Sequence, residues 1–309
     1  MSLPLQPVVF GFGAHSTLAE RDELLQLTQL ADEAGLDVFS LSDHPYLGER
    51  IDAYAALGFI LGRTHRLTGF ANVTNLPTRP APMLARAITS LAPLSDQRVV
   101  LGLGAGGSWD HITDMGVPRL SAGEAVEAFE EAIVLVKALA DGVPPITVDG
   151  HHYRVNQIAP APVTAPPVWT GSVGRKSLAA TGRVADGWIP SHAADWLSPR
   201  YRESRPIVDE AAAAAGRSPE QIRTIFNLPG RITDRPTTST RDHTGRWTGG
   251  STDQWINELT TAVDDHHATG FILFSPNGGT PDAVSLRRWA EHIAPAVREA
   301  TATTWSPTT

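Results

Sequence analysis

The sequence predicts one (β/α)8 barrel that spans residues 1–309 as a single domain. Two features of the chain predict this fold. Short apolar runs rich in β-branched residues alternate with segments of helical period, and eight such runs occur in 309 residues. Alternation of this kind predicts parallel strands joined by helices. Eight units in this length fit a closed barrel better than a doubly wound sheet with a second domain.

The predicted strands are separated by stretches long enough to hold a helix. They cover residues 8–13, 38–42, 67–73, 99–104, 168–170, 187–190, 223–228 and 271–275. A helix is expected over 80–94, and capping chemistry predicts other helix starts at 17–20, 121–124, 218–220 and 280–282. Irregular insertions remain at 108–120, 141–166 and 232–250. The middle insertion is expected to be a small excursion closed by the Asp-Gly turn at 149–150.

Composition excludes several classes of function. Asp and Glu number 33 against 25 Lys and Arg, which argues against nucleic acid or an anionic membrane as the main partner, because both need a basic stripe. The chain has no cysteine, which excludes disulfides, thiolate metal sites, iron–sulfur clusters and thiol nucleophiles. Any electron carrier would therefore be a bound cofactor rather than a group of the protein itself. No signal-peptide pattern or membrane-spanning apolar run occurs, so we expect a cytoplasmic protein.

Polar residues and glycines follow the predicted strands. Active sites of (β/α)8 barrels lie at the carboxyl ends of the strands, so these residues are expected to surround one pocket. They are His15, Asp43, His44, Asn72, Thr74, Asn75, Ser191, His192 and Asn227, with the glycine-rich segments 104–108, 171–175 and 277–279. His15 and His192 are expected to line the pocket, where they would contact substrate.

Asp43 and His44 form the sharpest pair among these residues. An adjacent acid and imidazole at a strand end can hold one proton and pass it to a reacting atom near neutral pH. The alternative is a helix cap beside a surface histidine. The position at a barrel strand end favours the catalytic interpretation.

Two glycine-rich segments predict a ligand with a flat ring and an anionic group. Backbone amides, a helix dipole and a cation meet in Gly171, Ser172, Val173, Gly174 and Arg175, which indicates a phosphate site. A glycine-eased turn is the alternative. Gly104, Ala105, Gly106 and Gly107 belong to a nominal dinucleotide fingerprint, but no helix starts at that loop. Close approach of a flat ring to the backbone accounts better for these glycines.

Two other chemistries are less consistent with the sequence. A metal-dependent barrel hydrolase would have paired histidines after the first strand, where only His15 stands, and no H-E-x-x-H motif occurs. We therefore expect no metal in the active site. No G-x-S-x-G nucleophile elbow occurs either. A sugar-binding or nucleotide-binding barrel without turnover would leave the polar strand ends unexplained.

Several segments together make the chain similar to a known family. They are 42–44, 62–67, 94–106, 150–153, 167–171 and 182–188, which read SDH, GRTHRL, LSDQRVVLGLGAG, GHHY, PVWTG and GRVADGW. Over residues 8–298 the chain resembles the luciferase-like monooxygenase superfamily, in the branch that uses the deazaflavin coenzyme F420.

The resemblance implies an oxidoreductase that transfers a hydride between F420 and a small organic or peptide-like substrate, at a C=C, C=N or C=O bond. His44 would donate or relay a proton next to the ring, with Asp43 beside it, and the phosphate would rest on residues 171–175. A non-proline cis peptide is expected at Asn72-Val73, followed by Thr74, behind the ring. The alternative is an FMN-dependent monooxygenase on the same scaffold. A homodimer is expected from the resemblance alone.

The sequence departs from the deazaflavin sugar-phosphate dehydrogenases of this family at two places. Those enzymes have a glutamate where this chain has Gly107, and a tryptophan where it has Tyr46 and Leu47. The resemblance therefore does not predict sugar-phosphate dehydrogenation. Substrate choice is expected to depend on loops around Trp109, Trp196 and Trp247, whose rings favour a bulky or hydrophobic ligand.

Overall fold

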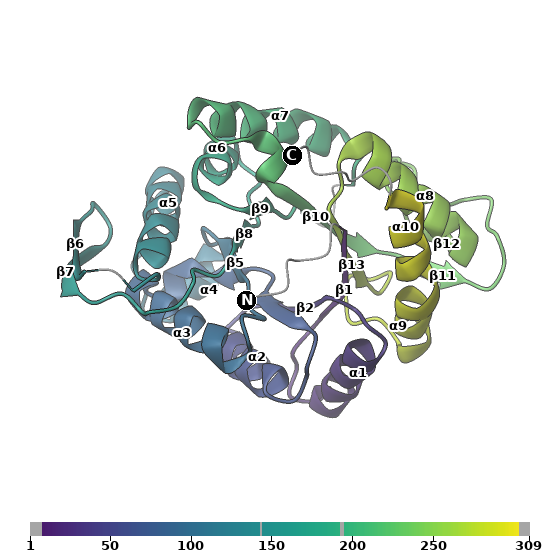
Figure 1. The fold of residues 1–309 in the computed structure, drawn as a ribbon, viewed down its shortest axis with the longest axis horizontal. Coiled ribbons are helices and arrows are strands. Elements are labelled where there is room, and N and C mark those ends of the chain that lie inside the picture. Colours follow the sequence, from purple (N-terminus) through teal and green to yellow (C-terminus); the bar gives the residue numbers. More distant parts are fainter. Residues whose placement is uncertain (1–7, 143, 192–194, 303–309) are drawn as a thin grey trace.

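A ring of parallel strands forms the centre of the protein (Figure 1). The computed structural model describes residues 8–142, 144–191 and 195–302. In spatial order the strands are β3 (Thr68–Ala71), β2 (Val38–Leu41), β1 (Val9–Ala14), β13 (Gly270–Phe274), β10 (Arg223–Pro229), β9 (Gly187–Trp188), β8 (Val168–Thr170), β5 (Leu101–Gly104) and β4 (Thr74–Asn75).

The ring closes as eight strand positions. Only Asn72 and Val73 separate β3 from β4, so these two segments occupy one position. A parallel bridge between Gly69 and Val99 joins that position to the chain entering β5. The predicted (β/α)8 barrel is therefore confirmed, with each of the eight predicted strands in place.

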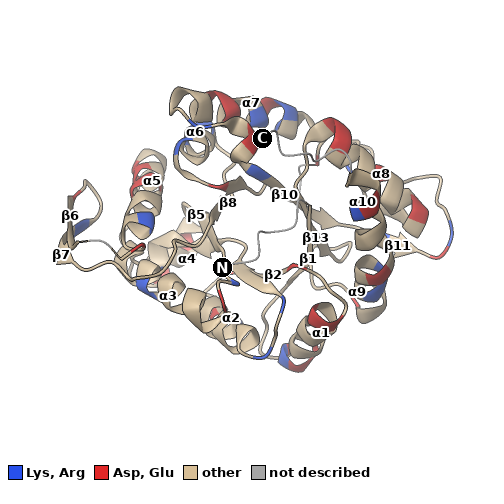
Figure 2. Ribbon diagram, viewed as in Figure 1, with Lys and Arg blue, Asp and Glu red and all other residues tan. Residues whose placement is uncertain are grey.

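Helices surround the barrel on the outside (Figure 1). They are α1 (Arg21–Glu33), α2 (Ala53–Leu61), α3 (Ala81–Leu94), α4 (Trp109–Asp114), α5 (Ala122–Ala138), α6 (Arg175–Val184), α7 (Pro199–Ala214), α8 (Thr252–His266), α9 (Ala283–Arg288) and α10 (Ala294–Thr301), with short helical segments Leu76–Thr78, Pro219–Gln221 and Trp289–Ile293. Figure 2 shows acidic and basic residues mixed over these outer helices. No described helix is long and apolar enough to cross a membrane.

Two apolar layers hold the fold together, because alternate residues of a strand point to opposite faces. Val9, Phe70, Trp169 and Ile272 belong to a cluster of buried side chains from the strands and the residues next to them, which fills the barrel. Their neighbours, such as Phe10, belong to the larger cluster that packs the strands against the helices.

The capping predictions had mixed outcomes. Ser121 and Glu124 form the expected capping box at α5. Thr17 and Glu20 bond to each other, but α1 begins only at Arg21 and the Glu20 side chain does not cap it, so that prediction was wrong. The residues after Ser218 form one short turn, because β10 begins at Arg223 and leaves no room for a longer helix.

The three predicted insertions each contain or border secondary structure. The middle one holds the antiparallel hairpin β6 (Ile146–Asp149) and β7 (Arg154–Ile158), which confirms the excursion predicted there. The first contains the short helix α4, which begins at Trp109, so the expectation that no helix starts at the loop 104–107 was wrong. The third is bracketed by β11 (Arg231–Thr233) and β12 (Gly249–Ser251), which pair with each other.

Candidate active site

The buried carboxylate of Asp43 lies in the loop after β2 and is fixed by three hydrogen bonds. Arg79 donates from Nε to Oδ2 at 2.9 Å and from Nη2 to Oδ1 at 2.7 Å, and the N–H of Asn75 donates to Oδ2 at 3.0 Å. The Asp43 side chain is 1% exposed. A bidentate pair of this kind fixes both position and orientation. Asp43 is therefore held by a cation, and its carboxylate accepts from groups other than the imidazole of His44.

Arg79 joins three elements at the mouth of the barrel, which is the end where the carboxyl ends of the strands lie. Besides Asp43 it binds Asp52, the N-cap of α2, at 2.7 Å, and its guanidinium lies 4.7 Å above the ring of Tyr54. Burial lowers the pKa of Arg79, but hydrogen bonds and charges from Asp43 and Asp52 outweigh burial and raise the pKa above its usual value. Arg79 stays protonated. The Tyr54 hydroxyl, 2.9 Å from Thr74 Oγ1, links the same cluster to β4.

His44 is directed by its neighbours towards the neutral form. Its Nδ1 lies 2.8 Å from the hydroxyl of Tyr46, which leaves Nε2 as the nitrogen for a reacting atom. Burial lowers the pKa of His44, the Arg50 cation lowers it further, and the charge of Asp43 offsets only part of this. Burial, followed by Arg50, also lowers the pKa of His15. Both imidazoles are therefore uncharged at neutral pH.

A shelf of backbone and one apolar side chain lies at the ends of β3, β5 and β8. The predicted cis peptide bond between Asn72 and Val73 is confirmed. A Cβ on Gly104 would come within 2.7 Å of Val73 Cγ2, and a Cβ on Gly171 within 3.0 Å of the same atom. The Val73 side chain therefore packs on two glycines. On the other side, the Asn72 amide donates to Asn227 Oδ1 at 2.9 Å and to Ser40 Oγ at 3.2 Å.

The glycines after β5 have reasons inside the protein. Gly104 makes room for Val73, and Gly106 has a φ of +94° and packs on Pro77, where a Cβ would lie 2.6 Å from Cγ. Packing inside the protein is therefore a sufficient reason for glycine at these two positions, and the approach of a bound ring to them stays a prediction. Gly107 differs, since a Cβ there would meet no atom within 4 Å. Ala105, between Gly104 and Gly106, is half-buried.

The turn between β8 and α6 has exposed residues and backbone N–H groups without acceptors. Trp188 Nε1 donates to the carbonyl of Ser172 at 2.9 Å, and the Ser172 hydroxyl accepts from Thr181 at 2.9 Å. These two bonds hold the turn against β9 and α6. Among the described residues the N–H groups of Val173 and Arg175 have no acceptor. Gly174 is the N-cap of α6, and both Gly174 and Arg175 are exposed. This is the chemistry of an anion site.

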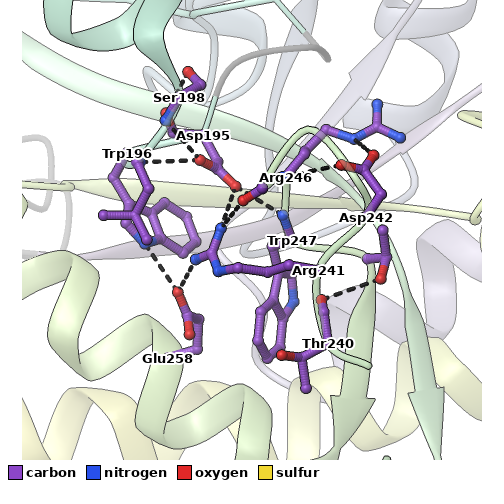
Figure 3. Close-up of polar contacts among 12 residues, drawn as sticks. Asp195, Trp196, Ser198, Thr240, Arg241, Asp242, Arg246, Trp247 and Glu258 are labelled. Atoms are coloured by element: carbon purple, nitrogen blue, oxygen red, sulfur yellow. Dashed lines mark hydrogen bonds and ion pairs between the residues drawn. The ribbon is translucent and has the colours of Figure 1, made fainter. Parts of the chain in front are cut away.

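The tryptophans expected to face substrate have different surroundings. Trp109 begins α4, next to the glycine loop, and is half-buried. Trp196 and Trp247 are 1% and 3% exposed and belong to the core, so the expectation for these two was wrong. Both tryptophans lie beside α8, where Trp247 packs on Trp255 and Trp196 Nε1 donates to Glu258. An ion network joins the same segments, because Arg241 of the third insertion binds Asp195 and Glu258 (Figure 3). His192 lies outside the described residues.

Two residues of the mouth were missed as site residues by sequence reasoning. The Arg50 side chain is 15% exposed, and its Nε and Nη1 are buried with no hydrogen-bond partner among the described residues. Arg79 follows the third predicted strand by six residues, which is the one signal that could have drawn attention to it.

A closed parallel barrel with polar groups gathered where its strands end defines the class of (β/α)8-barrel enzymes. A family model described as luciferase-like monooxygenase matches residues 8–304. The chain belongs to the luciferase-like monooxygenase family.

Individual relatives agree with this assignment. An F420-dependent glucose-6-phosphate dehydrogenase of Microbacterium testaceum (strain StLB037) is 30% identical over 237 residues, which are 74% of this chain and 68% of that protein. A coenzyme F420-dependent tetrahydromethanopterin reductase from Methanopyrus kandleri has a similar fold, with a TM-score of 0.78 and 16% identity over 93% of this chain and 99% of that one. For an F420-dependent secondary alcohol dehydrogenase in complex with an F420–acetone adduct, the TM-score is 0.77 with 16% identity, over 95% and 100% of the two chains.

Proposed function

We propose that this protein is an F420-dependent oxidoreductase that moves a hydride between F420 and an organic substrate. The observation that carries the proposal is the shelf at the strand ends, where the apolar side chain of Val73 packs on Gly104 and Gly171, which carry no side chains of their own. A flat deazaflavin ring needs such a surface. The curated relative that is 30% identical is named for the same cofactor, which supports this choice.

The residues around the mouth fit a cofactor with a ring and a phosphate. Ser42 Oγ, Asn75 Oδ1 and Ser191 Oγ are buried without a hydrogen-bond partner among the described residues. Such atoms cost free energy unless a ligand or water pairs with them. We propose that Asn72, Val73, Thr74 and the loop 104–107 hold the ring. The N-terminus of α6 with Arg175 would hold the phosphate, through its N–H groups and positive dipole.

When bound, F420 would accept a hydride from an alcohol or, once reduced, donate one to a double bond, while the protein orients the substrate and moves the proton. In this arrangement His44 exchanges a proton at Nε2, while the contact between its Nδ1 and the Tyr46 hydroxyl holds the ring in place. Because the lowered pKa keeps His44 neutral at neutral pH, it is ready to accept a proton from an alcohol. In the opposite direction it relays a proton to a reduced C=C, C=N or C=O bond. Asp43 and Arg79 act as positioning residues, because their bonds fix the loop that carries His44.

The substrate proposed is a small or peptide-like organic molecule with a polarised double bond or the corresponding alcohol. The two departures from the sugar-phosphate dehydrogenases, at Gly107 and Tyr46, lie in the mouth itself. Gly107 has open space where a side chain would extend. The Tyr46 hydroxyl contacts His44 Nδ1, and its ring stacks on that of His111 with the ring centroids 5.1 Å apart. We therefore propose a substrate other than a sugar phosphate.

Turnover of reduced F420 tests the proposal. Purified protein is mixed with reduced F420 and a panel of activated alkenes, imines and carbonyl compounds, and return of the oxidised cofactor's visible absorbance is followed. Oxidation that depends on both enzyme and acceptor, and that is lost in His44→Gln, is expected. Turnover with reduced FMN and oxygen, and none with F420, would establish the monooxygenase alternative instead.

We also propose that the protein forms a homodimer. Phe59 on α2 and Leu94 at the end of α3 are 55% and 79% exposed, and a Cβ on Gly58 of α2 would lie 3.5 Å from Leu91 Cδ2 of α3. Apolar side chains exposed on adjoining elements favour a protein interface. Light scattering after size exclusion would give twice the mass of the chain, and a monomer mass at micromolar concentration would refute this.

A further inference from the structure

The β6–β7 hairpin meets α5 at a cluster of two imidazoles and one carboxylate. Glu127 lies on α5, and His151 and His152 lie in the turn between the two strands. One potential ligand atom from each residue lies within 4.8 Å of the other two. Figure 1 shows the hairpin outside the ring of helices, beside α5. The cluster is thus separate from the mouth that carries His44.

The backbone of the two histidines is held against α5 by a second carboxylate. Glu131 accepts the N–H groups of His151, His152 and Tyr153 at 3.0, 2.8 and 3.2 Å. Residues four apart share one face of a helix, so Glu127 lies one turn from Glu131 on the same face. The turn is therefore docked with both rings next to Glu127, without use of the Glu127 carboxylate itself.

Both rings direct a nitrogen at the same oxygen. His151 Nδ1 and His152 Nε2 each lie 3.7 Å from Glu127 Oε2, too far for a hydrogen bond. The His152 side chain is 13% exposed, and its Nε2 is shielded from solvent with no hydrogen-bond partner among the described residues. A shielded nitrogen without a partner costs free energy. The cluster therefore holds a shielded ring nitrogen that has no hydrogen-bond partner among the described residues and lies beside a carboxylate oxygen.

We propose that Glu127, His151 and His152 bind a divalent transition-metal ion of the zinc type, and that the ion fastens the hairpin to α5. Imidazole nitrogen and carboxylate oxygen bind zinc at about 2.0–2.2 Å in a tetrahedron, which puts the ligand atoms about 3.4 Å apart. The two nitrogen–oxygen distances of 3.7 Å are close to that separation, and the three ligand atoms all lie within 4.8 Å of one another. His151 is 73% exposed, so its ring is free to rotate and complete the site. Water would occupy the fourth position, and two imidazoles favour zinc over magnesium or calcium.

Calorimetric titration with zinc chloride tests the site. The full chain, without a polyhistidine tag and stripped of metal with EDTA, is expected to bind one equivalent. His152→Ala and Glu127→Gln are each expected to lose at least about 100-fold in affinity, more than outer partners of metal ligands usually contribute. His292→Ala removes an exposed histidine from a different helix and is the matched control. It is expected to bind zinc as the parent chain does.

Two further readouts separate this site from adventitious binding at other histidines. Cobalt(II) in place of zinc is expected to give the visible absorption of a tetrahedral ion, lost in His152→Ala. Zinc is expected to slow amide hydrogen exchange in residues 146–158. Absence of saturable binding, or equal binding by the parent chain and both cluster variants, would overturn the proposal. Binding that leaves exchange in the hairpin unchanged would overturn the fastening role.

Discussion

Replacement of Arg79 by glutamine is expected to destabilise the protein strongly. The Asp43 carboxylate is 1% exposed and takes two of its three hydrogen bonds from Arg79. Loss of the cation leaves a buried charge with one backbone N–H, and breaking a buried ion pair in this way costs about 3–5 kcal/mol. Stability is measured by urea denaturation, followed by tryptophan fluorescence, so the result does not depend on cofactor.

Two matched variants separate the cost of leaving a buried charge unpaired from the cost of losing an exposed ion pair. Asp43→Asn keeps the side-chain shape and leaves Arg79 paired with Asp52, so a smaller loss of about 1.5–3 kcal/mol is expected. Asp52 is 47% exposed and asparagine caps a helix equally well, so Asp52→Asn is expected to cost less than about 1 kcal/mol. If Arg79→Gln cost no more than Asp52→Asn, the buried pair would not be what organises the mouth.

Three further outcomes follow from the geometry of the mouth. Gly104→Ala brings a Cβ within 2.7 Å of Val73 Cγ2 and is expected to lower both stability and cofactor affinity. Combining Gly104→Ala with Val73→Ala is expected to restore part of each. A double variant no better than the single variant would contradict this packing. His44→Gln is expected to reduce kcat at least about 100-fold, the lower range for a general acid or base, and to remove the acidic limb of the kcat/KM profile; an unchanged profile would exclude His44. Because burial lowers the pKa of His15 and His44 below the usual 6.5, the unfolded chain binds more protons once the pH falls below 6.5. Their contribution to stability is therefore complete above pH 6.5 and lost as the pH falls through the lowered values, so Tm is expected to fall over that range less steeply in His44→Gln than in the parent chain; equal slopes would contradict it.

Local pattern was enough to predict the barrel. Each of its strands is a short apolar run, and a run such as Val168–Thr170 is buried on both faces in the structure, so strand and core signals coincide. Helix α2 was not predicted, although Asp52 before it is a good N-cap signal. Its apolar residues extend round the helix to the exposed Phe59, which blurs the helical period.

Contacts between distant segments limited the prediction of the site. Asp43 and Arg79 stand 36 residues apart, so their pairing depends on the fold rather than on local spacing. The packing of Val73 on Gly104 and Gly171 joins three strand ends, and only the assembled barrel shows that two of the glycines accommodate a side chain. Trp196 and Trp247 look like ligand-facing rings in loops. Tertiary packing of the insertion against α8 buries them instead.

Binding of the two candidate cofactors tests the central proposal most directly. Purified protein is titrated with F420 and separately with FMN, and the fluorescence of its tryptophans is followed. Saturable binding of F420 and not of FMN is predicted, with an affinity that Arg175→Ala weakens and Lys176→Ala, its exposed neighbour, changes less. Binding of FMN alone, or of neither cofactor, would contradict the account.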